Sequence, residues 1–69
     1  MNFINQKELE VTNSMIRQNE IRKILSGNTI DYKYHKTKAN YAVAYRFFVH
    51  KRDYERAIRL IRNSELING

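Results

Sequence analysis

Hydrophobic and polar residues alternate along three segments of this chain and follow a helical spacing along two others. Segments 8–12, 29–35 and 41–50 show the period of two that is typical of β-strands, and the last of them is the most regular. Segments 14–26 and 51–63 space their apolar residues so that they fall on one face of an α-helix. The predicted order is therefore strand, helix, strand, strand, helix.

The first predicted helix has recognisable signals at both ends. Ser14 is a good N-cap residue, and Gly27 is predicted to be the residue just past the helix end. The predicted apolar stripe consists of Ile16, Ile21, Ile24 and Leu25. An alternative is one helix from Asn5 to Ser26. That helix would place three polar residues on its apolar stripe, so a strand followed by a helix is preferred.

Segments 29–35 and 41–50 are predicted to form an antiparallel hairpin that is joined by the polar loop 36–40. One face of this hairpin is predicted to be buried. It carries Ile30, Tyr32, Tyr34, Tyr41, Val43, Tyr45 and Phe47. The other face, the outer one, carries Lys33, His35, Arg46, Phe48 and His50.

The economical packing of these elements is an α+β fold of order β-α-β-β-α, with two helices on one face of a three-stranded antiparallel sheet. The right-handed crossover rule places the third strand between the other two. This is a ferredoxin-like half-sandwich with an open edge and an uncovered outer face. We expect one domain, 1–69, with an ordered core of about 8–62 and flexible segments 1–6 and 64–69. The tail either frays or adds a short strand.

The chain has 69 residues, a formal net charge of +6, no Cys and no Pro. This length supports one small domain, and without Cys there is no disulfide or thiolate metal site to stabilise it. No apolar stretch approaches the ~20 residues of a membrane span, and the N-terminal residues lack the pattern of a secretory signal. We therefore expect a cytoplasmic protein with no membrane partner.

The positive charge is concentrated in the second half of the chain. Residues 1–29 carry four basic and three acidic side chains, whereas residues 33–62 carry nine basic and two acidic ones. A basic half of this kind is typical of proteins that bind nucleic acid or another polyanion. It would equally steer the chain toward an acidic protein partner.

Nine residues of this basic half form the candidate binding patch. They are Lys33, His35, Lys36, Lys38, Arg46, Phe48, Arg52, Arg56 and Arg59. An exposed Phe48 among cations suits the stacking of nucleobases on a sheet, although the Gly-containing signature of RNA-recognition domains is absent. The arginines of the last predicted helix form a row that ends at Arg62. This row suits either contact with phosphate groups or simple exposure to solvent. Lys36 and Lys38, with Lys33 and His35 near the hairpin tip, suit anion contact or protection of a sheet edge.

The sequence gives little support to catalysis. It contains no HExxH, Walker or GxSxG motif and no Cys. His35 and His50 could come within reach of one another across the hairpin, but no acid–base pair is evident. We expect a non-enzymatic protein that uses no metal, no cofactor and no small-molecule substrate.

Two stretches carry a resemblance to a known family. GNTIDYK, 27–33, opens the second predicted strand, and VHKRDYERAIRLI, 49–61, leads into the last helix. Together with a helix that ends before Gly27, they resemble the small bacterial signal-transducing protein domains. These are βαββα modules similar in fold to nitrogen-regulatory PII-type proteins. The resemblance covers about residues 8–62 and implies the fold and a regulatory role, whereas the Lys-rich segment 33–38 departs from the family pattern.

The preferred interpretation is a small interaction or regulatory module. It would act by self-association or by binding an acidic protein partner, with Lys33, Arg46 and Phe48 at the centre of the contact. The alternative is a small basic nucleic-acid-binding protein that uses the open sheet face and the Arg-rich helix face. A third interpretation is a protein of a phage or mobile element that blocks a larger nucleic-acid machine.

Overall fold

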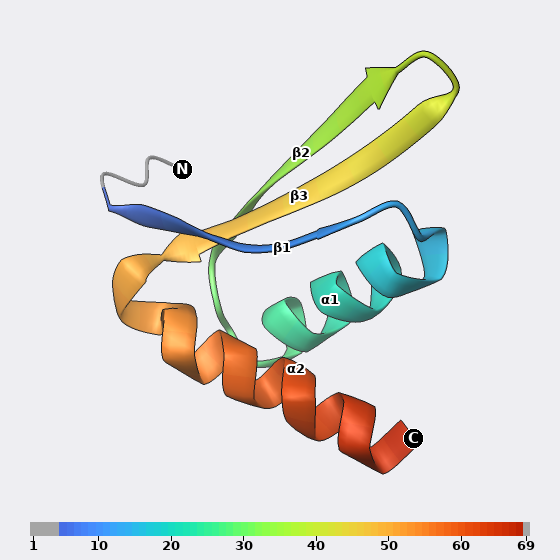
Figure 1. The fold of residues 1–69 in the computed structure, drawn as a ribbon. Helices are drawn as coiled ribbons and strands as arrows, with labels where there is room; N and C mark the ends of the chain where they lie inside the picture. Colours follow the sequence, from blue (N-terminus) through green and yellow to red (C-terminus); the bar gives the residue numbers. More distant parts are fainter. Residues whose placement is uncertain (1–4, 69) are drawn as a thin grey trace.

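The computed structural model describes residues 5–68, and their side chains as far as Ser64 (Figure 1). The elements in chain order are β1 (Gln6–Thr12), α1 (Met15–Gly27), β2 (Tyr32–Ala39), β3 (Ala42–His50), the 3₁₀ turn η1 (Lys51–Asp53) and α2 (Tyr54–Asn68). The predicted α+β class and the β-α-β-β-α order are confirmed. The alternative of a short terminal strand in the tail is wrong, because α2 continues to Asn68.

The sheet has the order β1-β3-β2, and both pairings are antiparallel. The predicted central position of the third strand is therefore confirmed. Both helices lie on one side of the sheet, and β1 and β2 form its two edges (Figure 1). The register of β1 against β3 shifts between Glu8 and Glu10, so β1 contains an irregularity of the β-bulge type.

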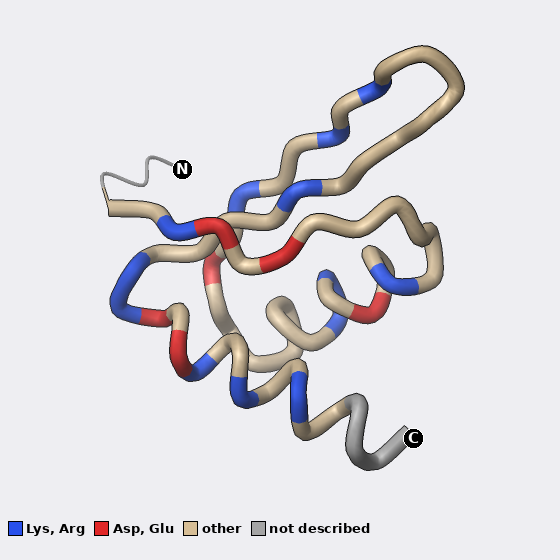
Figure 2. Tube along the Cα trace, viewed as in Figure 1, with Lys and Arg blue, Asp and Glu red and all other residues tan. Residues whose placement is uncertain are grey.

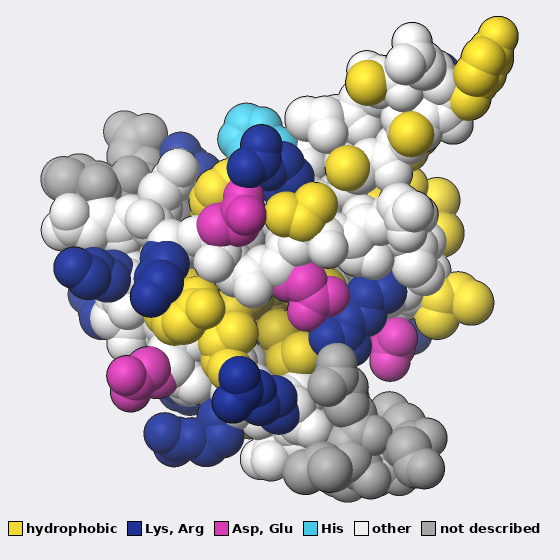
Figure 3. All heavy atoms as spheres, viewed as in Figure 1, with side chains coloured by type: hydrophobic (Ala, Val, Ile, Leu, Met, Phe, Trp, Pro, Cys, Tyr) yellow, Lys and Arg dark blue, Asp and Glu magenta, His cyan; other side chains and the backbone are white. Residues whose placement is uncertain are grey.

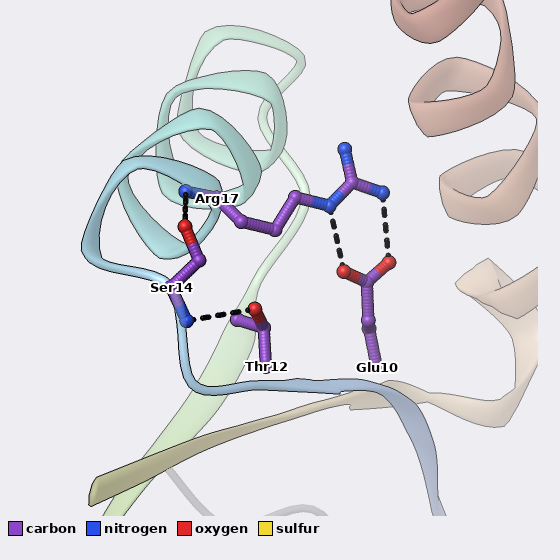
Figure 4. A network of polar contacts seen from close by, with 4 residues as sticks. All are labelled: Glu10, Thr12, Ser14 and Arg17. Carbon is purple, nitrogen blue, oxygen red and sulfur yellow. Dashed lines mark hydrogen bonds and ion pairs between the residues drawn. The ribbon is translucent and has the colours of Figure 1, made fainter.

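Side-chain hydrogen bonds define the start of α1 (Figure 4). The backbone N–H of Ser14 donates to Thr12 Oγ1 at 3.1 Å, and Ser14 Oγ accepts from the backbone N–H of Arg17 at 3.1 Å. The predicted N-cap at Ser14 is confirmed. The alternative of one helix from Asn5 to Ser26 is wrong, because Gln6–Thr12 pairs with β3.

The end of α1 differs from the prediction. Gly27 is the last helical residue and has a negative φ, so it is not the left-handed residue beyond the helix. Thr29 occupies that position, with φ of 57°. The N–H of Thr29 donates to the Ser26 carbonyl and the N–H of Ile30 to the Leu25 carbonyl, which is the hydrogen-bond pattern of the Schellman motif. A β-branched residue is unusual in this conformation.

The core lies between the sheet and the two helices. Phe47 and Val49 of β3 and Ile21 and Leu25 of α1 are completely buried. The other buried apolar residues are Leu9, Ile30, Tyr45, Ala57 and Ile61. Since every described element except η1 contributes to this cluster or flanks it, the sheet and helices form one packed unit.

Two residues that were expected in the core are exposed. Ile16 is 75% exposed, and the polar Gln18 is buried on α1 instead. Tyr41 is fully exposed, because it lies in the turn between β2 and β3 and not within the strand. The hairpin loop is also shorter than predicted. Residues 36–39 continue β2, and the turn consists of Asn40 and Tyr41, with Asn40 at φ of 56°.

Candidate partner-binding surfaces

The hairpin of β2 and β3 extends beyond the rest of the sheet. The last pair between β1 and β3 is Thr12 with Tyr45, whereas β2 and β3 remain paired as far as Ala39 with Ala42 (Figure 1). We refer to residues 37–44 as the arm. Its turn lies about 13 Å past Tyr45, at ~3.3 Å per strand residue. The arm is therefore a two-stranded ribbon with mostly exposed side chains.

The charge of this hairpin has one sign. Between Tyr32 and His50 the chain carries Lys33, Lys36, Lys38 and Arg46 and no Asp or Glu. Figure 2 shows basic residues along β2 up to the arm and no acidic residue on either strand of the hairpin. Neither Lys36 nor Lys38 forms an ion pair with a carboxylate in the described part of the chain. Their charges are consequently available to a partner.

The register distributes the cations of β2 over both faces. Lys36 is opposite Tyr45, which is buried on the helix side, so Lys36 and Lys38 lie on the helix-side face. Lys33 is opposite Phe48 and His35 is opposite Arg46, so these two lie on the outer face. The prediction that all four belong to one hairpin tip is wrong, because residues 33–39 are part of a strand.

The outer face is less basic than predicted. The Arg46 guanidinium donates from Nε (3.1 Å) and Nη2 (2.6 Å) to Oε2 of Glu8, which lies on the same face. The Arg46 guanidinium carbon also lies over the Phe48 ring, 5.8 Å from its centroid, and the His35 and Phe48 rings are nearly perpendicular with a centroid distance of 5.9 Å. Phe48 is thus half-buried between neighbours and is not a bare stacking platform.

The arginines of α2 form a separate surface. Arg52 of η1 and Arg56, Arg59 and Arg62 of α2 are exposed, and Figure 2 shows basic residues at intervals along this part of the chain. Arg56 Nη2 donates to the Asn28 carbonyl at 3.0 Å and links α2 to the α1–β2 connection. Arg52 Nε lies 4.0 Å from Oδ2 of Asp53. Among the described residues Arg59 and Arg62 have no ion pair.

The candidate patch is therefore not one surface. The sheet separates its outer-face members, Lys33, His35, Arg46 and Phe48, from the arginines of α2, because α2 packs against the opposite face (Figures 1 and 2). Lys36 and Lys38 are on the helix side, at the far end of the hairpin from the start of α2. A single ligand would have to extend around the sheet to contact all nine residues.

Sequence reasoning missed the side-chain partners of two arginines of α1. Glu10 of β1 accepts from Arg17 Nε (2.7 Å) and Nη2 (2.9 Å) of α1, in the two-pronged pair shown in Figure 4. Arg22 of α1 donates to the Tyr32 hydroxyl at 3.4 Å, and this hydrogen bond raises the pKa of Arg22 above its ordinary value. Both arginines are occupied within the fold.

The two histidines do not form a site together. His35 is opposite Arg46, so His50 lies four residues farther along β3. Its Nδ1 accepts from the backbone N–H of Arg52 at 3.1 Å, which caps η1. In the part of the chain that the structure describes, no group of three His, Cys, Asp or Glu residues is placed to hold a metal ion.

One shallow hollow lies beside the connection from α1 to β2. It has a volume of about 280 Å³ and is lined by Ser26, Thr29, Ile30, Asp31 and Tyr32. It lies at the end of the hairpin opposite the arm, and none of the nine candidate residues contributes to it.

No helix in the described part of the chain combines the length and the apolar character that crossing a membrane requires. Comparison with protein-family models, with curated proteins and with solved structures gave no match.

Proposed function

We propose that this chain is a non-enzymatic binding module that takes an extended acidic segment of a partner protein on the open edge of β2. The proposal rests on one observation above all. The hairpin from Tyr32 to His50 combines an unpaired strand edge with four basic residues and no carboxylate. We also propose a regulatory role for this module. It is supported by the resemblance to the PII-like signal-transducing domains, which have a ferredoxin-like fold.

Strand addition explains why both features occur together. The outward N–H and C=O groups of an edge strand bind the backbone of an added strand, and side chains at alternate positions provide specificity. Lys36 and Lys38 lie on one face at a spacing of two, so carboxylates at a spacing of two on the added strand would face them. Charge attraction would also speed association and make it sensitive to salt.

The proposal is tested by an NMR titration of the isotope-labelled chain. The probe is a short capped peptide of alternating Glu and Val. We expect amide shifts concentrated on residues 33–44, with an affinity that falls as salt is added. A peptide with N-methyl groups at alternate positions keeps its charge but loses backbone donors, and we expect it to bind about tenfold more weakly or worse.

Two charge-reversal variants separate the edge from the net charge. Lys36→Glu with Lys38→Glu should abolish peptide binding. Arg59→Glu with Arg62→Glu changes the net charge by the same amount on α2 and should leave binding nearly unchanged. Equal losses in both variants would show attraction to net charge alone, and equal binding of the N-methylated peptide would exclude strand addition.

Nucleic-acid binding is the second candidate, and it is favoured by the exposed arginines of α2. Arg59 and Arg62 have no ion pair among the described residues and lie three positions apart on one face of α2, so both charges are presented on the same side of the helix. The same titration with a short mixed-sequence single strand and a short duplex tests it. Shifts on α2 that disappear with salt, and that are lost in the Arg59→Glu with Arg62→Glu variant, would support this second function.

A further inference from the structure

The outer face of the sheet carries a row of three side chains with a distinctive charge order. Glu8 of β1 and Lys33 of β2 are both direct neighbours of Phe48 of β3. The row therefore contains a carboxylate on one edge strand, an aromatic ring on the central strand and an ammonium group on the other edge strand. Both helices pack on the opposite face of the sheet, so this row is on its uncovered side (Figure 1).

Side chains around this row hold it in place. The His35 ring packs nearly perpendicular to the Phe48 ring, and Arg46 lies over the Phe48 ring while it donates to Glu8. Figure 3 shows the cyan histidine, a basic and an acidic side chain and apolar atoms close together above β1. Both hydrogen bonds from Arg46 end on Oε2 of Glu8, so Oε1 still has acceptor capacity.

This row is complementary to its own two-fold copy. We propose that the outer sheet face binds the same face of a second copy of this chain, about a two-fold axis parallel to β3. Such a rotation places β1 of one copy over β2 of the other. Lys33 of each copy then faces Glu8 of the other copy, and the two Phe48 rings meet at the centre. The contact is isologous and closes at a dimer.

The charges select this axis over the alternative. A two-fold axis across the strands would place β2 over β2 and bring Lys33 against Lys33, and like charges in contact are unfavourable. With the axis along β3, the neighbouring positions on that strand place Arg46 against Arg46 and His50 against His50. Each Arg46 already has Glu8 as its counter-ion, so Glu8 lies between Arg46 of its own copy and Lys33 of the other.

The shape of the molecule bears on the size of this contact. Its principal extents are 35 × 34 × 15 Å, so it is a thin slab with two broad faces. A stable protein interface buries about 800 Å² on each partner, so the proposed contact must extend over most of the outer sheet face. The inference is independent of the proposed acidic partner, because Lys36 and Lys38 lie on the opposite face of β2.

Two single charge reversals provide a direct test. In Lys33→Glu the row has two carboxylates, and in Glu8→Lys it has two ammonium groups. Sedimentation equilibrium should show a concentration-dependent dimer for the wild-type chain and a dissociation constant raised about tenfold or more for each variant alone. An equimolar mixture of the two variants should recover the dimer as a heterodimer, because positions 8 and 33 of one variant then face positions 33 and 8 of the other with opposite charges.

The control is Lys36→Glu, which changes the same charge on the same strand but on the helix-side face, and it should dimerise like the wild-type chain. Circular dichroism checks that each variant is folded. The inference is overturned if the wild-type chain stays monomeric at millimolar concentration. It is also overturned if the mixture of folded variants dimerises no better than each variant alone. Loss of peptide binding in Lys36→Glu with Lys38→Glu, without loss of the dimer, separates this interface from the proposed function.

Discussion

The two edge strands of the sheet differ in whether their charged side chains have ion-pair partners within the molecule. On β1, Glu8 and Glu10 each accept two hydrogen bonds from an arginine of another element, Arg46 of β3 and Arg17 of α1. On β2, Lys36 and Lys38 have no ion pair in the described part of the chain. The acidic edge is thus neutralised inside the molecule, whereas the basic edge is not.

This difference indicates which edge belongs to the fold and which is available for binding. β1 carries a register shift and a buried Leu9, and its carboxylates join it to the central strand and to the first helix. β2 continues into an arm that packs against no helix beyond Tyr45. Cations on an edge strand disfavour pairing between like edges, so we expect β2 to resist pairing with its own copy and, under the proposed function, to accept an acidic strand.

The largest effect that would test this comparison is expected from the core of β1. Leu9→Ala removes a side chain that is buried among the core residues and should lower the free energy of unfolding by about 2–4 kcal/mol. Urea denaturation measures it. Val11→Ala, on the same strand but 48% exposed on the outer face, is the control and should change stability by less than about 1 kcal/mol. Similar values for both would mean that β1 is not anchored by its core side.

The next effect compares the two ion pairs of β1. The Arg17–Glu10 side chains are 20% and 27% exposed, whereas the Arg46–Glu8 side chains are 47% and 39% exposed. Glu10→Gln should lower the free energy of unfolding by about 1–2 kcal/mol, because a two-pronged charged pair is lost in a half-buried site. Glu8→Gln should lower it by less than about 1 kcal/mol, as for exposed pairs.

Two double-mutant cycles measure the coupling free energy of each ion pair. One combines Glu10→Gln with Arg17→Ala, and the other combines Glu8→Gln with Arg46→Ala. The coupling energy should be larger for Glu10 with Arg17. The reverse order would mean that the outer face, and not the contact with α1, holds β1 in place.

The sequence predicts the elements of this fold better than its surfaces, and the reasons are physical. The alternating residues of segment 41–50 have one apolar face, so a strand is unambiguous there, although it begins only at Ala42. Residues 36–39 are mostly polar because no helix covers the arm, and the same alternation rule therefore predicts a loop there. The balance of Arg46 by Glu8 joins positions 38 residues apart, and it depends on a register that a bulge shifts. The resulting row of Glu8, Phe48 and Lys33 is not visible in the one-dimensional pattern.

A smaller effect concerns the connection that leads into β2. Gly27 has a helical conformation with open space where a Cβ would lie, and Thr29 has the left-handed conformation that Gly adopts readily. Gly27→Ala should therefore raise the free energy of unfolding by about 0.5–1 kcal/mol. Thr29→Gly should raise it by about 0.5 kcal/mol, because relief of the left-handed conformation exceeds the added entropy of the unfolded chain.

Thermal and urea unfolding measure both changes. Asn40→Gly is the matched control for Thr29, since its φ of 56° is almost the same but Asn tolerates this region. A gain at Asn40 equal to that at Thr29 would mean that β-branching is not the source of strain.

The smallest effect on stability is expected where the comparison predicts the largest effect on binding. Lys38 is exposed, lies opposite Val43 on the arm and has no ion pair among the described residues. Lys38→Glu should change the free energy of unfolding by less than about 0.5 kcal/mol. Any change should be a small gain at low salt that disappears at high salt, because the new carboxylate is close only to positive charges on this hairpin. Urea denaturation at the two salt concentrations measures this, with Arg62→Glu on α2 as the control. A loss above about 1 kcal/mol would assign Lys38 to the fold, and β2 would then be a structural edge like β1.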